Sequence, residues 1–475
     1  MAIRRTKTKI LATLGPATDS EENILKLVDA GVNGFRLNFS HGDKEYFDNL
    51  FSIINKVCET RKLPIPIIQD LQGPKIRIGK LKKDKIKIKS GDSIEITIDK
   101  IEGDEKIISA SYQQLVSDAQ IGETILIDDG LIKLEVIKKK ERSLICKIIE
   151  GGKLKPKKGM NLPGMKLSTP ALTEQDKANL EFALQYRIDY VALSFVRSAN
   201  DIIELRNWLL ERGFNKPIIA KIEKPEAVEN FEEILKVADV IMVARGDLGV
   251  EIEPQLVPTI QKTIIRRCNE VGKLVITATQ MLESMITNPI PTRAEASDVA
   301  NAVLDGTDVV MLSGETAAGD YPIKTVEMMR EILLSIQSQR RFVFKVNWEA
   351  PTDKIQNIFD ATAKGFSQIA DQVKADAIVV FTHAGRQAMR MSKYNPNADI
   401  YAFSDNFEVL NALNLHKAIT PLYLKDINDE KYYMNRSVEI LKDKKFVSDG
   451  DLLLFAAGAP LAEVERKSWV RFKVV

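Results

Sequence analysis

Short apolar runs alternate with amphipathic segments over most of the chain. Residues 20–30 have helical periodicity behind a potential N-cap at Ser20, and residues 258–271 have the same periodicity. Eight apolar runs of strand length are separated mostly by segments of this kind, at residues 9–14, 34–39, 65–71, 190–195, 218–223, 240–244, 274–278 and 309–312. Eight strands alternating with helices predict an α/β protein with a (β/α)8 TIM barrel, whose chemistry lies at the carboxyl ends of the strands.

Two intervals break this alternation. Between residues 72 and 168, polar and apolar residues alternate with a period of two and Asp-Gly pairs mark turns, which predicts a small β-barrel domain inserted after the third strand. An insertion at the rim of a barrel is well placed to act as a lid. After residue 345, five further strand-like runs alternate with helices and predict an open α/β domain for oligomerisation or effector binding. The predicted domains are residues 1–71 with 169–345, residues 72–168, and residues 346–475.

Composition narrows the possible partners. The chain has 475 residues, more than one hydrophobic core usually supports, which agrees with two or three domains. Its 68 Lys and Arg residues against 66 Asp and Glu residues leave a net charge of +2, so nucleic acid is not expected as a ligand. The three cysteines have no metal-ligand spacing, and no apolar stretch suits a signal peptide or a membrane span. We therefore expect a cytoplasmic protein with no membrane partner.

Polar residues gather at the carboxyl ends of the predicted strands. They are Arg36, Asn38, Ser40, Asp70, Glu223, Asp247, Thr279, Ser313 and Glu315. Lys221 and Glu223 lie on the same face of one strand because side chains alternate with a period of two, and Asp247 follows the next strand. One cation and two carboxylates at neighbouring strand ends indicate a site for an anion and a metal ion. The alternative for the same residues is a buried ion pair.

The chain lacks the common phosphate-binding motifs of nucleotide-binding proteins. Neither GxxxxGK(S/T) nor GxGxxG occurs in the sequence. No His/Cys cluster indicates zinc, whereas carboxylates with hydroxyls and arginine favour a hard cation such as Mg²⁺, with substrate oxygens completing its coordination. Arg36 and Arg77 then suit recognition of a phosphate or carboxylate. For Arg36, the alternative is a salt bridge at the end of a strand.

Eight segments together resemble the pyruvate kinase family. They are ATLGPAT at 12–18, FRLNFSHG at 35–42, QDLQGPKIR at 69–77, AKIEKPEA at 220–227, VARGDLGVE at 243–251, ATQMLESM at 278–285, PTRAEASDVANAVLDGTD at 291–308 and MLSGETAAGDYP at 311–322. They occur in the family's order, and the resemblance extends over the whole chain. The family's architecture of barrel, inserted β domain and C-terminal α/β domain agrees with the one that periodicity predicts.

The resemblance implies that the chain transfers the phosphoryl group of phosphoenolpyruvate to ADP, giving pyruvate and ATP in the last step of glycolysis, as a homotetramer. Glu223 and Asp247 are similar to the ligands of Mg²⁺ (or Mn²⁺) in the family. Lys221 and Arg36 resemble the cations that face the phosphoryl group, and Thr279 resembles the hydroxyl near the proton path to the enolate. The implied binding residues are Lys221, Ala244, Arg245, Gly246, Asp247 and Thr279 for the substrate, and Asn38, His41 and Arg77 for the nucleotide. For His41, the alternative to a nucleotide contact is a packed-core or capping position.

One segment departs from the pattern of many family members. Relatives that need K⁺ hold it with the counterparts of Asn38, Ser40 and Asp70, aided by a threonine, and carry an acidic residue shortly afterwards. Here the threonine position is Leu71 and the acidic position is Lys75. Because an ammonium group can take the place of a monovalent cation among oxygen acceptors, we predict that K⁺ is not required.

Further departures concern ligand contacts. Ala318 stands where relatives often have lysine, so one phosphate or nucleotide contact is expected to be missing. The glycine-rich effector loop of relatives is replaced at residues 458–467. A phosphate could still bind where a predicted strand passes into a helix, at Thr382, His383, Ala384, Gly385 and Arg386. Fructose 1,6-bisphosphate, a sugar monophosphate, AMP, or no effector with an ordinary strand–helix turn remain alternatives.

Two other functions compete with this one. A Mg²⁺-dependent barrel aldolase or lyase acting on pyruvate enolates would also need a Glu/Asp metal pair, and a Schiff base at Lys221 would be its chemical signature. The inserted domain and the segments at 278–285 and 311–322 argue against it. A catalytically silent sensor or scaffold is disfavoured because all the candidate catalytic side chains are present.

Overall fold

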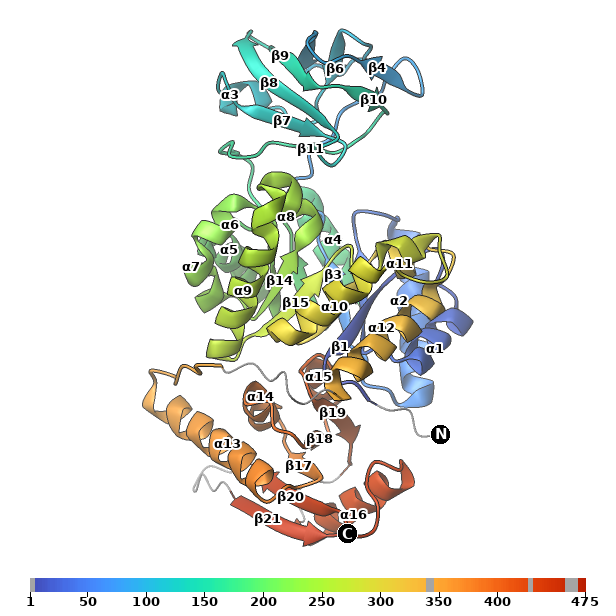
Figure 1. The fold of residues 1–475 in the computed structure, drawn as a ribbon, viewed down its shortest axis with the longest axis vertical. Coiled ribbons are helices and arrows are strands. Elements are labelled where there is room, and N and C mark those ends of the chain that lie inside the picture. Colours follow the sequence, from blue (N-terminus) through green and yellow to red (C-terminus); the bar gives the residue numbers. More distant parts are fainter. Residues whose placement is uncertain (1–4, 339–345, 426–429, 458–468) are drawn as a thin grey trace.

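The computed structural model of the chain describes residues 5–338, 346–425, 430–457 and 469–475. The replaced effector loop at residues 458–467 and the predicted domain boundary at residue 345 lie outside the described residues. Three bodies follow one another along the long axis of the molecule, with the inserted domain at one end, the barrel in the middle and the C-terminal domain at the other end (Figure 1).

Eight parallel strands close into a barrel in the order β1-β16-β15-β14-β13-β12-β3-β2, which confirms the predicted fold class. Their bounds are β1 (Lys9–Leu14), β2 (Gly34–Asn38), β3 (Ile67–Asp70), β12 (Tyr190–Leu193), β13 (Ile218–Ile222), β14 (Val240–Ala244), β15 (Leu274–Ala278) and β16 (Val309–Leu312). The observed strands differ from the predicted ones by at most two residues at either end. At the carboxyl ends of β2 and β3, backbone hydrogen bonds continue one residue beyond the strand, from the N–H of Phe39 to Asp70 and from the N–H of Leu71 to Ala192, both at 3.0 Å.

Alternate residues of each barrel strand point to the barrel interior and to the surrounding helices. In β13, Ile219 belongs to the interior cluster with Met242 of β14. Ile218 and Ile222 instead pack outside the barrel, in the cluster beneath the helices. The period of two therefore carries the interior row of β13 from Ile219 to Lys221, at the carboxyl end of the strand.

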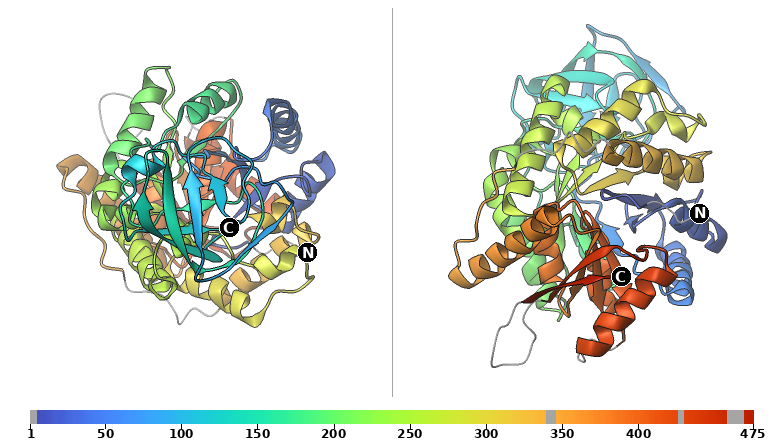
Figure 2. Two further views of the ribbon diagram at one scale, coloured as in Figure 1. Left: turned by 90° about the horizontal axis from the view of Figure 1, so that it is seen from above. Right: turned by 60° about the horizontal axis from the view of Figure 1, so that its bottom comes forward.

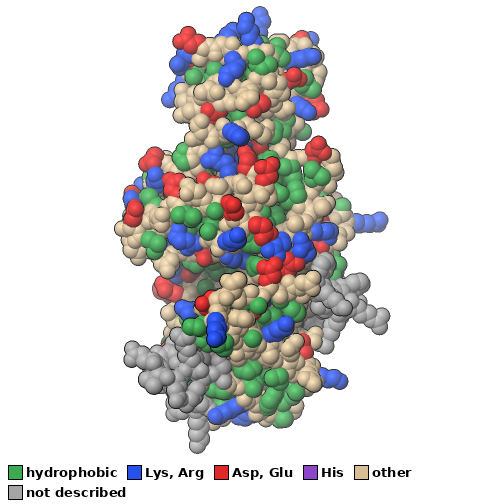
Figure 3. All heavy atoms as spheres, turned by 90° about the vertical axis from the view of Figure 1, so that its left-hand side faces the viewer, with side chains coloured by type: hydrophobic (Ala, Val, Ile, Leu, Met, Phe, Trp, Pro, Cys, Tyr) green, Lys and Arg blue, Asp and Glu red, His purple; other side chains and the backbone are tan. Residues whose placement is uncertain are grey.

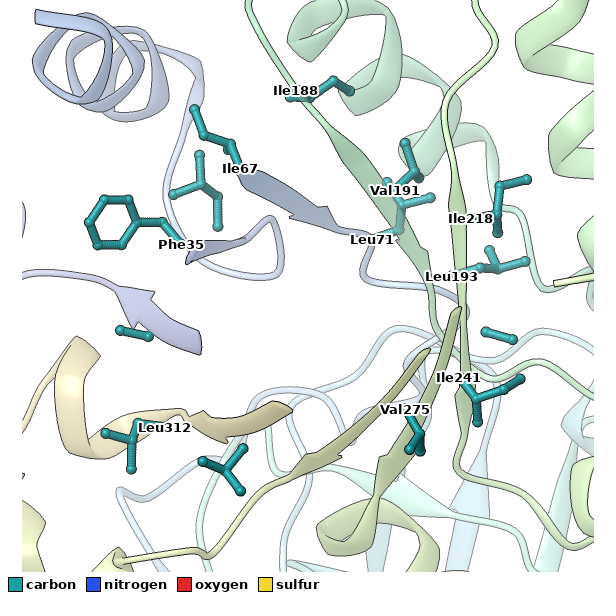
Figure 4. Packing of buried hydrophobic residues seen from close by; sticks show 14 of the residues in the cluster. Phe35, Ile67, Leu71, Ile188, Val191, Leu193, Ile218, Ile241, Val275 and Leu312 are labelled. Carbon is teal, nitrogen blue, oxygen red and sulfur yellow. The ribbon is translucent and has the colours of Figure 1, made fainter. Parts of the chain in front are cut away.

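The surrounding helices bury their apolar faces in one large cluster outside the barrel. They are α1 (Glu21–Ala30), α2 (Lys44–Arg61), α4 (Glu174–Ala183), α5 (Ala199–Leu210), α6 (Pro225–Glu229), α7 (Phe231–Val237), α8 (Arg245–Glu251), α9 (Val257–Val271), α10 (Arg293–Asp305), α11 (Gly314–Ala317) and α12 (Pro322–Ser338). Figure 4 shows Leu71, Val191 and Leu193 in this cluster. As predicted, Ser20 caps α1, and its hydroxyl accepts a hydrogen bond from the N–H of Asn23 at 3.2 Å.

The chain between β3 and β12 forms a separate domain with its own core. Its strands pair in a six-stranded sheet, β11-β7-β8-β9-β5-β6, and a two-stranded sheet, β10-β4. Its elements are β4 (Ile86–Ile88), β5 (Ser93–Thr97), β6 (Ile107–Ser109), α3 (Leu115–Asp118), β7 (Thr124–Ile127), β8 (Ile132–Lys139), β9 (Ser143–Glu150), β10 (Gly152–Leu154) and β11 (Met160–Asn161). The core is rich in isoleucine, including Ile96 and Ile108. The domain lies beyond α8, across the centre of the barrel when seen from above (Figures 1 and 2).

The last part of the chain forms the predicted open α/β domain. Its sheet has the order β19-β18-β17-β20-β21, with β21 antiparallel to β20 and the other pairs parallel. Its elements are α13 (Lys354–Gln372), β17 (Ala377–Phe381), α14 (Arg386–Lys393), β18 (Asp399–Ser404), α15 (Phe407–Leu413), β19 (Ile419–Tyr423), α16 (Glu430–Asp443), β20 (Leu452–Ala457) and β21 (Trp469–Val474). Separate apolar clusters cover the two faces of this sheet, because alternate residues of each strand point to opposite sides.

A segment of the C-terminal domain closes the amino-terminal end of the barrel. Leu415 is fully buried in the barrel's interior cluster, together with Leu11 and Ile68. The side-chain amide of Asn414 donates to the carbonyl oxygens of Asn33 and Pro64, which precede β2 and β3, at 2.8 and 2.7 Å. The opposite end, which carries the polar strand termini, therefore faces the inserted domain.

The molecular surface carries charges of both signs. Basic and acidic side chains are interspersed on the face shown in Figure 3, in agreement with the net charge of +2. Within the described ranges, every helix is too short or too polar to be a candidate for spanning a membrane.

Candidate active site

The ammonium group of Lys221 lies at the centre of a buried polar cluster at the carboxyl ends of the barrel strands. Its Nζ is 2.9 Å from Oε1 of Glu223 and 3.2 Å from Oδ1 of Asp70. It also donates a hydrogen bond of 2.7 Å to Oγ of Ser194. Lys221 is 8% exposed and each of the two acidic residues 1%. The cluster forms because β3, β12 and β13 are neighbours whose interior rows end in these residues.

The surrounding charges keep Lys221 protonated. Burial alone would lower the pKa of Lys221, but the carboxylates of Asp70 and Glu223 outweigh burial, and its pKa is raised. A lysine must lose its proton before it can attack a carbonyl carbon and form a Schiff base. The ion-paired Lys221 therefore does not suit the aldolase alternative. It suits a fixed positive charge that faces an anion.

The guanidinium of Arg36 shares the Asp70 carboxylate with Lys221. Its Nε donates to Oδ2 of Asp70 at 2.6 Å, and its NH1 donates to the hydroxyl of Thr13 at 3.0 Å. Burial would raise the pKa of Asp70, yet the charges of Lys221 and Arg36 lower it, so the carboxylate stays ionised. The strand-end salt bridge that was the alternative for Arg36 is therefore present. It also fixes the guanidinium at the rim, where it can meet an anion.

Two carboxylates at the rim differ in how they are satisfied. Glu223 pairs with Lys221 through Oε1, and its Oε2 accepts the N–H of Phe195 at 2.8 Å. Burial raises the pKa of Glu223, an effect that Lys221 opposes and that nearby Asp247 reinforces. Asp247 lies in the first turn of α8, and within the described residues its carboxylate has no hydrogen bond or ion pair. This unpaired carboxylate distinguishes the cluster from a self-contained buried ion pair.

The donor set fits a divalent cation that takes part of its coordination from a ligand. Among the described residues, no group of three or more His, Cys, Asp or Glu side chains is arranged to hold a metal ion. Mg²⁺ is usually bound by one or two carboxylates, with water and substrate oxygens at the other positions. Glu223 and Asp247 fit that pattern, and Mn²⁺ accepts the same oxygen donors.

The first turn of α8 is fixed by residues that follow β15. The hydroxyl of Thr279 accepts the N–H of Gly246 at 2.7 Å and donates to the preceding carbonyl oxygen at 2.6 Å. The Arg245 side chain donates to the carbonyl oxygen of Thr279 at 2.7 Å and pairs with both oxygens of Asp298, at 2.8 and 2.6 Å. Because its side chain is engaged in this way, any contribution of Arg245 to substrate binding is expected from its main chain, together with Ala244.

The candidate nucleotide contacts His41 and Arg77 are close enough for the charge of the arginine to affect the histidine. His41 is exposed, which excludes the packed-core alternative, and the capping residue of α2 is Asp43. Partial desolvation of the His41 ring nevertheless lowers its pKa, and the positive charges of Arg77, Lys75 and Arg36 lower it further. Arg77, at the start of the inserted domain, donates from NH1 to a carbonyl oxygen of the same domain at 3.3 Å. The chain thus presents several cations at the junction of barrel and inserted domain.

Of the residues in the predicted monovalent-cation region, Asn38 and Asp70 lie together at the barrel rim, whereas the side chains of Leu71 and Lys75 lie elsewhere. Asn38 and Asp70 are paired in register at the ends of β2 and β3, and Oδ1 of Asn38 accepts the N–H of Ser40 at 3.2 Å. Leu71 is 1% exposed and packs in the cluster outside the barrel, its side chain carries no oxygen, and its carbonyl oxygen accepts the hydroxyl of Ser194 at 2.7 Å. Lys75 is exposed, and within the described ranges no contact joins its ammonium to Asn38 or Asp70. Replacement of K⁺ by Lys75 therefore stays a prediction.

The predicted phosphate loop of the C-terminal domain lies between β17 and α14. Gly385 has a φ of 75° and precedes α14, which begins at Arg386. The N–H of Gly385 donates to the hydroxyl of Thr382 at 2.9 Å. Nδ1 of His383 lies 3.2 Å from Oδ1 of Asp405. Both side chains thus have internal partners, and effector binding at this loop stays a prediction.

Sequence reasoning did not identify three residues that shape the site. Ser194 accepts a hydrogen bond from the central lysine, Phe195 donates its backbone N–H to Glu223, and Asp298 holds Arg245. Ser194 stands at the carboxyl end of a barrel strand, the same signal that selected the other polar candidates, and could have been found. Asp298 lies on α10, 53 residues from Arg245, so no local pattern links the two.

Comparisons with known proteins agree with this architecture. A model described as "Pyruvate kinase, barrel domain" matches residues 5–326, and one described as "Pyruvate kinase, alpha/beta domain" matches residues 360–471. The chain is 41% identical over 472 residues to pyruvate kinases of Staphylococcus aureus strains MRSA252 and USA300, covering 99% of this chain and 80% of each relative. It is similar to the crystal structure of a pyruvate kinase from Cryptosporidium parvum, with a TM-score of 0.89 at 35% identity, covering 99% of this chain and 96% of that one. Because these matches extend over the barrel and the C-terminal domain alike, this chain belongs to the pyruvate kinase family.

Proposed function

We propose that the cluster at the barrel rim transfers the phosphoryl group of phosphoenolpyruvate to ADP in a Mg²⁺-dependent reaction that needs no K⁺. The observation that carries the proposal is the Lys221 ammonium, held 3.2 Å from Asp70 and 2.9 Å from Glu223 beside the unpaired Asp247. The aldolase or lyase alternative is not favoured, because the family matches extend along the whole chain and Lys221 is held protonated.

Each side chain of the cluster has a role that its geometry supports. Lys221 and Arg36 present fixed positive charge to the transferring phosphoryl group, and their carboxylate partners hold them in place before the reaction. Glu223 and Asp247 would hold Mg²⁺, and the bound ion would offset the negative charge of the substrate carboxylate and enolate oxygen. The main chain of the first turn of α8 receives the substrate carboxylate. The Thr279 hydroxyl stands by the path along which a proton reaches the enolate carbon.

The nucleotide is proposed to approach from the junction between the barrel and the inserted domain. Asn38, at the end of β2, and Arg77, at the start of the inserted domain, flank this junction on either side. His41 adds a hydrogen-bonding ring that is accessible to solvent. Cations and polar groups at this junction suit the phosphates of ADP, since guanidinium groups bind phosphate with paired hydrogen bonds.

A coupled assay that follows pyruvate and ATP formation tests the reaction. Phosphoenolpyruvate, ADP and Mg²⁺ should give turnover in buffer free of K⁺, EDTA should abolish it, and Mn²⁺ should restore it. An enzyme that forms no pyruvate under these conditions, or that forms it equally well in EDTA, would contradict the proposed chemistry. A borohydride trap with pyruvate should give no covalent adduct at Lys221.

The proposed effector site is the loop from Thr382 to Arg386, with a sugar phosphate or AMP as the ligand. The support is its position at the start of α14, where backbone N–H groups attract anions, next to the guanidinium of Arg386. A panel of sugar monophosphates, fructose 1,6-bisphosphate and AMP should reveal activation by one of them. Arg386→Ala should abolish that activation without loss of basal turnover.

The assembly is proposed to be a cytoplasmic homotetramer. In the sheet formed by the described residues, strand β21 lies at the edge, and Phe472 is 47% and Val474 64% exposed. The outer face of α13 exposes Ile355 and Ile358, at 46% and 58%. Unpaired edge strands and exposed apolar faces are typical of surfaces that associate. Sedimentation equilibrium measures the mass, and a monomer at assay concentration would contradict this assembly.

A further inference from the structure

A chain of three polar residues joins the inserted domain to the barrel beside the active site, and of these Lys224 and Glu251 are buried and Asn161 is half-buried. Nζ of Lys224 is 2.6 Å from Oε1 of Glu251, and Nδ2 of Asn161 donates to the same oxygen at 2.9 Å. The side chains of Lys224 and Glu251 are 8% and 0% exposed. Asn161 belongs to β11 of the inserted domain, Glu251 ends α8, and Lys224 directly follows Glu223. Three parts of the fold therefore meet at one carboxylate.

This contact differs from the attachments at the two places where the chain passes between the domains. At the first, Asp176 accepts two backbone N–H groups of residues 72–73 at 3.0 and 3.2 Å. At the second, Arg197 donates to two carbonyl oxygens of residues 167–169, both at 2.7 Å. These attachments hold the connecting segments to the barrel. Asn161 instead belongs to β11, the edge strand that pairs with β7 in the six-stranded sheet of the inserted domain. Its bond to α8 therefore ties the sheet itself to the barrel and constrains how the domain is tilted.

The strength of this contact depends on Lys224. A carboxylate as deeply buried as that of Glu251 needs a counter-charge, because the low-dielectric interior penalises an isolated charge. Lys224 supplies that charge through a charge-assisted hydrogen bond. Oε2 of Glu251 has no hydrogen-bond partner within the described part of the chain, so Oε1 carries both contacts. Removing the ammonium would leave the acceptor of Asn161 charged, buried and free to reorient.

Glu251 lies on the same helix as Asp247, the proposed metal ligand. Asp247 and Glu251 are four residues apart on α8, so they lie on the same face of that helix. Both line a cavity of about 30 Å³ between the barrel rim and the inserted domain, which Lys224 and Asn161 line as well. A cavity of that size holds about two water molecules. A shift of Glu251 therefore moves the helix face that presents Asp247.

We propose that Lys224 and Glu251 are positioning residues of the reaction. They hold the inserted domain over the barrel rim through Asn161, and they orient α8 so that its first turn faces the reacting groups. This inference rests on the proposed function for the role of Asp247, and it adds a coupling between the inserted domain and the metal-binding helix that the reaction itself does not require.

Two variants test the coupling from its two sides. Lys224→Met keeps the length of the side chain and removes its charge, whereas Asn161→Ala leaves the buried Lys224–Glu251 pair intact. Each is expected to lower kcat about tenfold and to raise KM for ADP several-fold, because small displacements of catalytic groups reduce rates steeply. KM for phosphoenolpyruvate should change less than about threefold, since the central lysine keeps its own partners. The double variant should be no worse than the single ones, because both act through Glu251.

A rescue and a matched control separate positioning from stability. Lys224→Arg retains the charge and should recover most of kcat. Lys262→Met removes another barrel lysine that pairs with a buried carboxylate, Asp305, between α9 and α10. It should lower the melting temperature without moving either KM.

A distance measurement that needs no activity completes the test. Cysteines introduced by Lys138→Cys in the inserted domain and Glu204→Cys on α5 lie at exposed positions, and the native cysteines are buried, so spin labels attach selectively. The distance distribution between these labels should broaden in Asn161→Ala and Lys224→Met and stay narrow in Lys262→Met.

The proposal is overturned if the Asn161 and Lys224 variants keep the distance distribution of the parent protein. It is also overturned if their kinetic losses match those of Lys262→Met, or if the double variant shows additive losses. A parent protein that transfers no phosphoryl group would refute the proposed function instead, and the distance measurement would still decide the coupling.

Discussion

The hydroxyl of Thr279 holds the backbone N–H of Gly246 at 2.7 Å, across the ends of the neighbouring strands β14 and β15. Thr279 adopts a φ of 68°, a conformation that β-branched residues rarely take and that costs about 1–3 kcal/mol. A Cβ added to Gly246 would lie 3.5 Å from this hydroxyl, an ordinary contact. The strained residue thus aims its hydroxyl at the first turn of α8, where the substrate carboxylate is proposed to bind.

Removing this hydroxyl should weaken substrate binding and turnover. Thr279→Val keeps the shape of the side chain but leaves the N–H of Gly246 without its acceptor, which costs roughly 1–3 kcal/mol. We expect kcat/KM for phosphoenolpyruvate to fall about 10- to 100-fold, by the conversion of about 1.4 kcal/mol per factor of ten. Thr279→Ser retains the acceptor and should stay within a few-fold of the parent enzyme. Steady-state kinetics of both variants measure this, and a valine variant with parental kinetics would contradict the role.

Replacing the central lysine should abolish phosphoryl transfer. Lys221→Met removes the charge that faces the phosphoryl group, and loss of one such preorganised group lowers kcat by about 10²- to 10³-fold or more. The carboxylates of Glu223 and Asp247 remain, so Mn²⁺ should still bind, as measured by electron paramagnetic resonance. Circular dichroism controls for folding, because the variant leaves Asp70 and Glu223 buried with less counter-charge. Near-parental turnover in this variant would refute the role of Lys221.

Restoring oxygen ligands near β3 should make the enzyme depend on K⁺. The parent enzyme should show the same rate with and without K⁺, because Leu71 replaces the threonine of K⁺-dependent relatives and the Lys75 ammonium is predicted to take the place of the ion. The double variant Leu71→Thr, Lys75→Glu removes the nearby ammonium and adds oxygens, so its activity should rise severalfold on addition of K⁺. A titration of activity with KCl, with tetramethylammonium chloride as the control for ionic strength, measures this. A parent enzyme that needs K⁺ would show that Lys75 does not take the place of the ion.

A half-buried histidine at the interface of the barrel and the C-terminal domain, His416, should make stability depend on pH. Burial lowers the pKa of His416 to about 4, and the charge of Lys9 adds to this effect. Between about pH 6.5, the unfolded value, and pH 4, the unfolded chain binds a proton here that the folded chain does not. Stability should therefore fall as pH falls through this window, by up to about 3 kcal/mol.

The variant His416→Gln isolates this contribution. Asp308, whose pKa burial raises to about 6, acts in the opposite sense over part of the same window, so absolute stabilities do not identify the histidine. The difference in unfolding free energy between the parent and His416→Gln does identify it, because Asp308 is present in both proteins. Urea unfolding at pH 4.5, 5.5 and 7 should show that acidification lowers the free energy of unfolding less in His416→Gln than in the parent. Parallel curves for the two proteins would assign the acid sensitivity to other groups.

Local pattern alone determined most of the fold of this chain and part of its site. The barrel strands and the open α/β domain follow from apolar runs and helical periods, because these patterns fix which face of each element is buried. The pairing of Lys221 with Glu223 could also be predicted from the sequence, since the two residues are two positions apart on one strand and must share its face.

Tertiary structure alone decided which side chains meet. Barrel closure pairs β3 with β12 and β12 with β13, and this brings Asp70 within 3.2 Å of Lys221 across 151 residues of sequence (221 − 70). Folding also places Asp298 against Arg245 and seats Leu415 inside the amino-terminal end of the barrel. These contacts depend on how whole elements pack. Local backbone preferences set the direction of a side chain on its own element, but not the partner that another element brings to it.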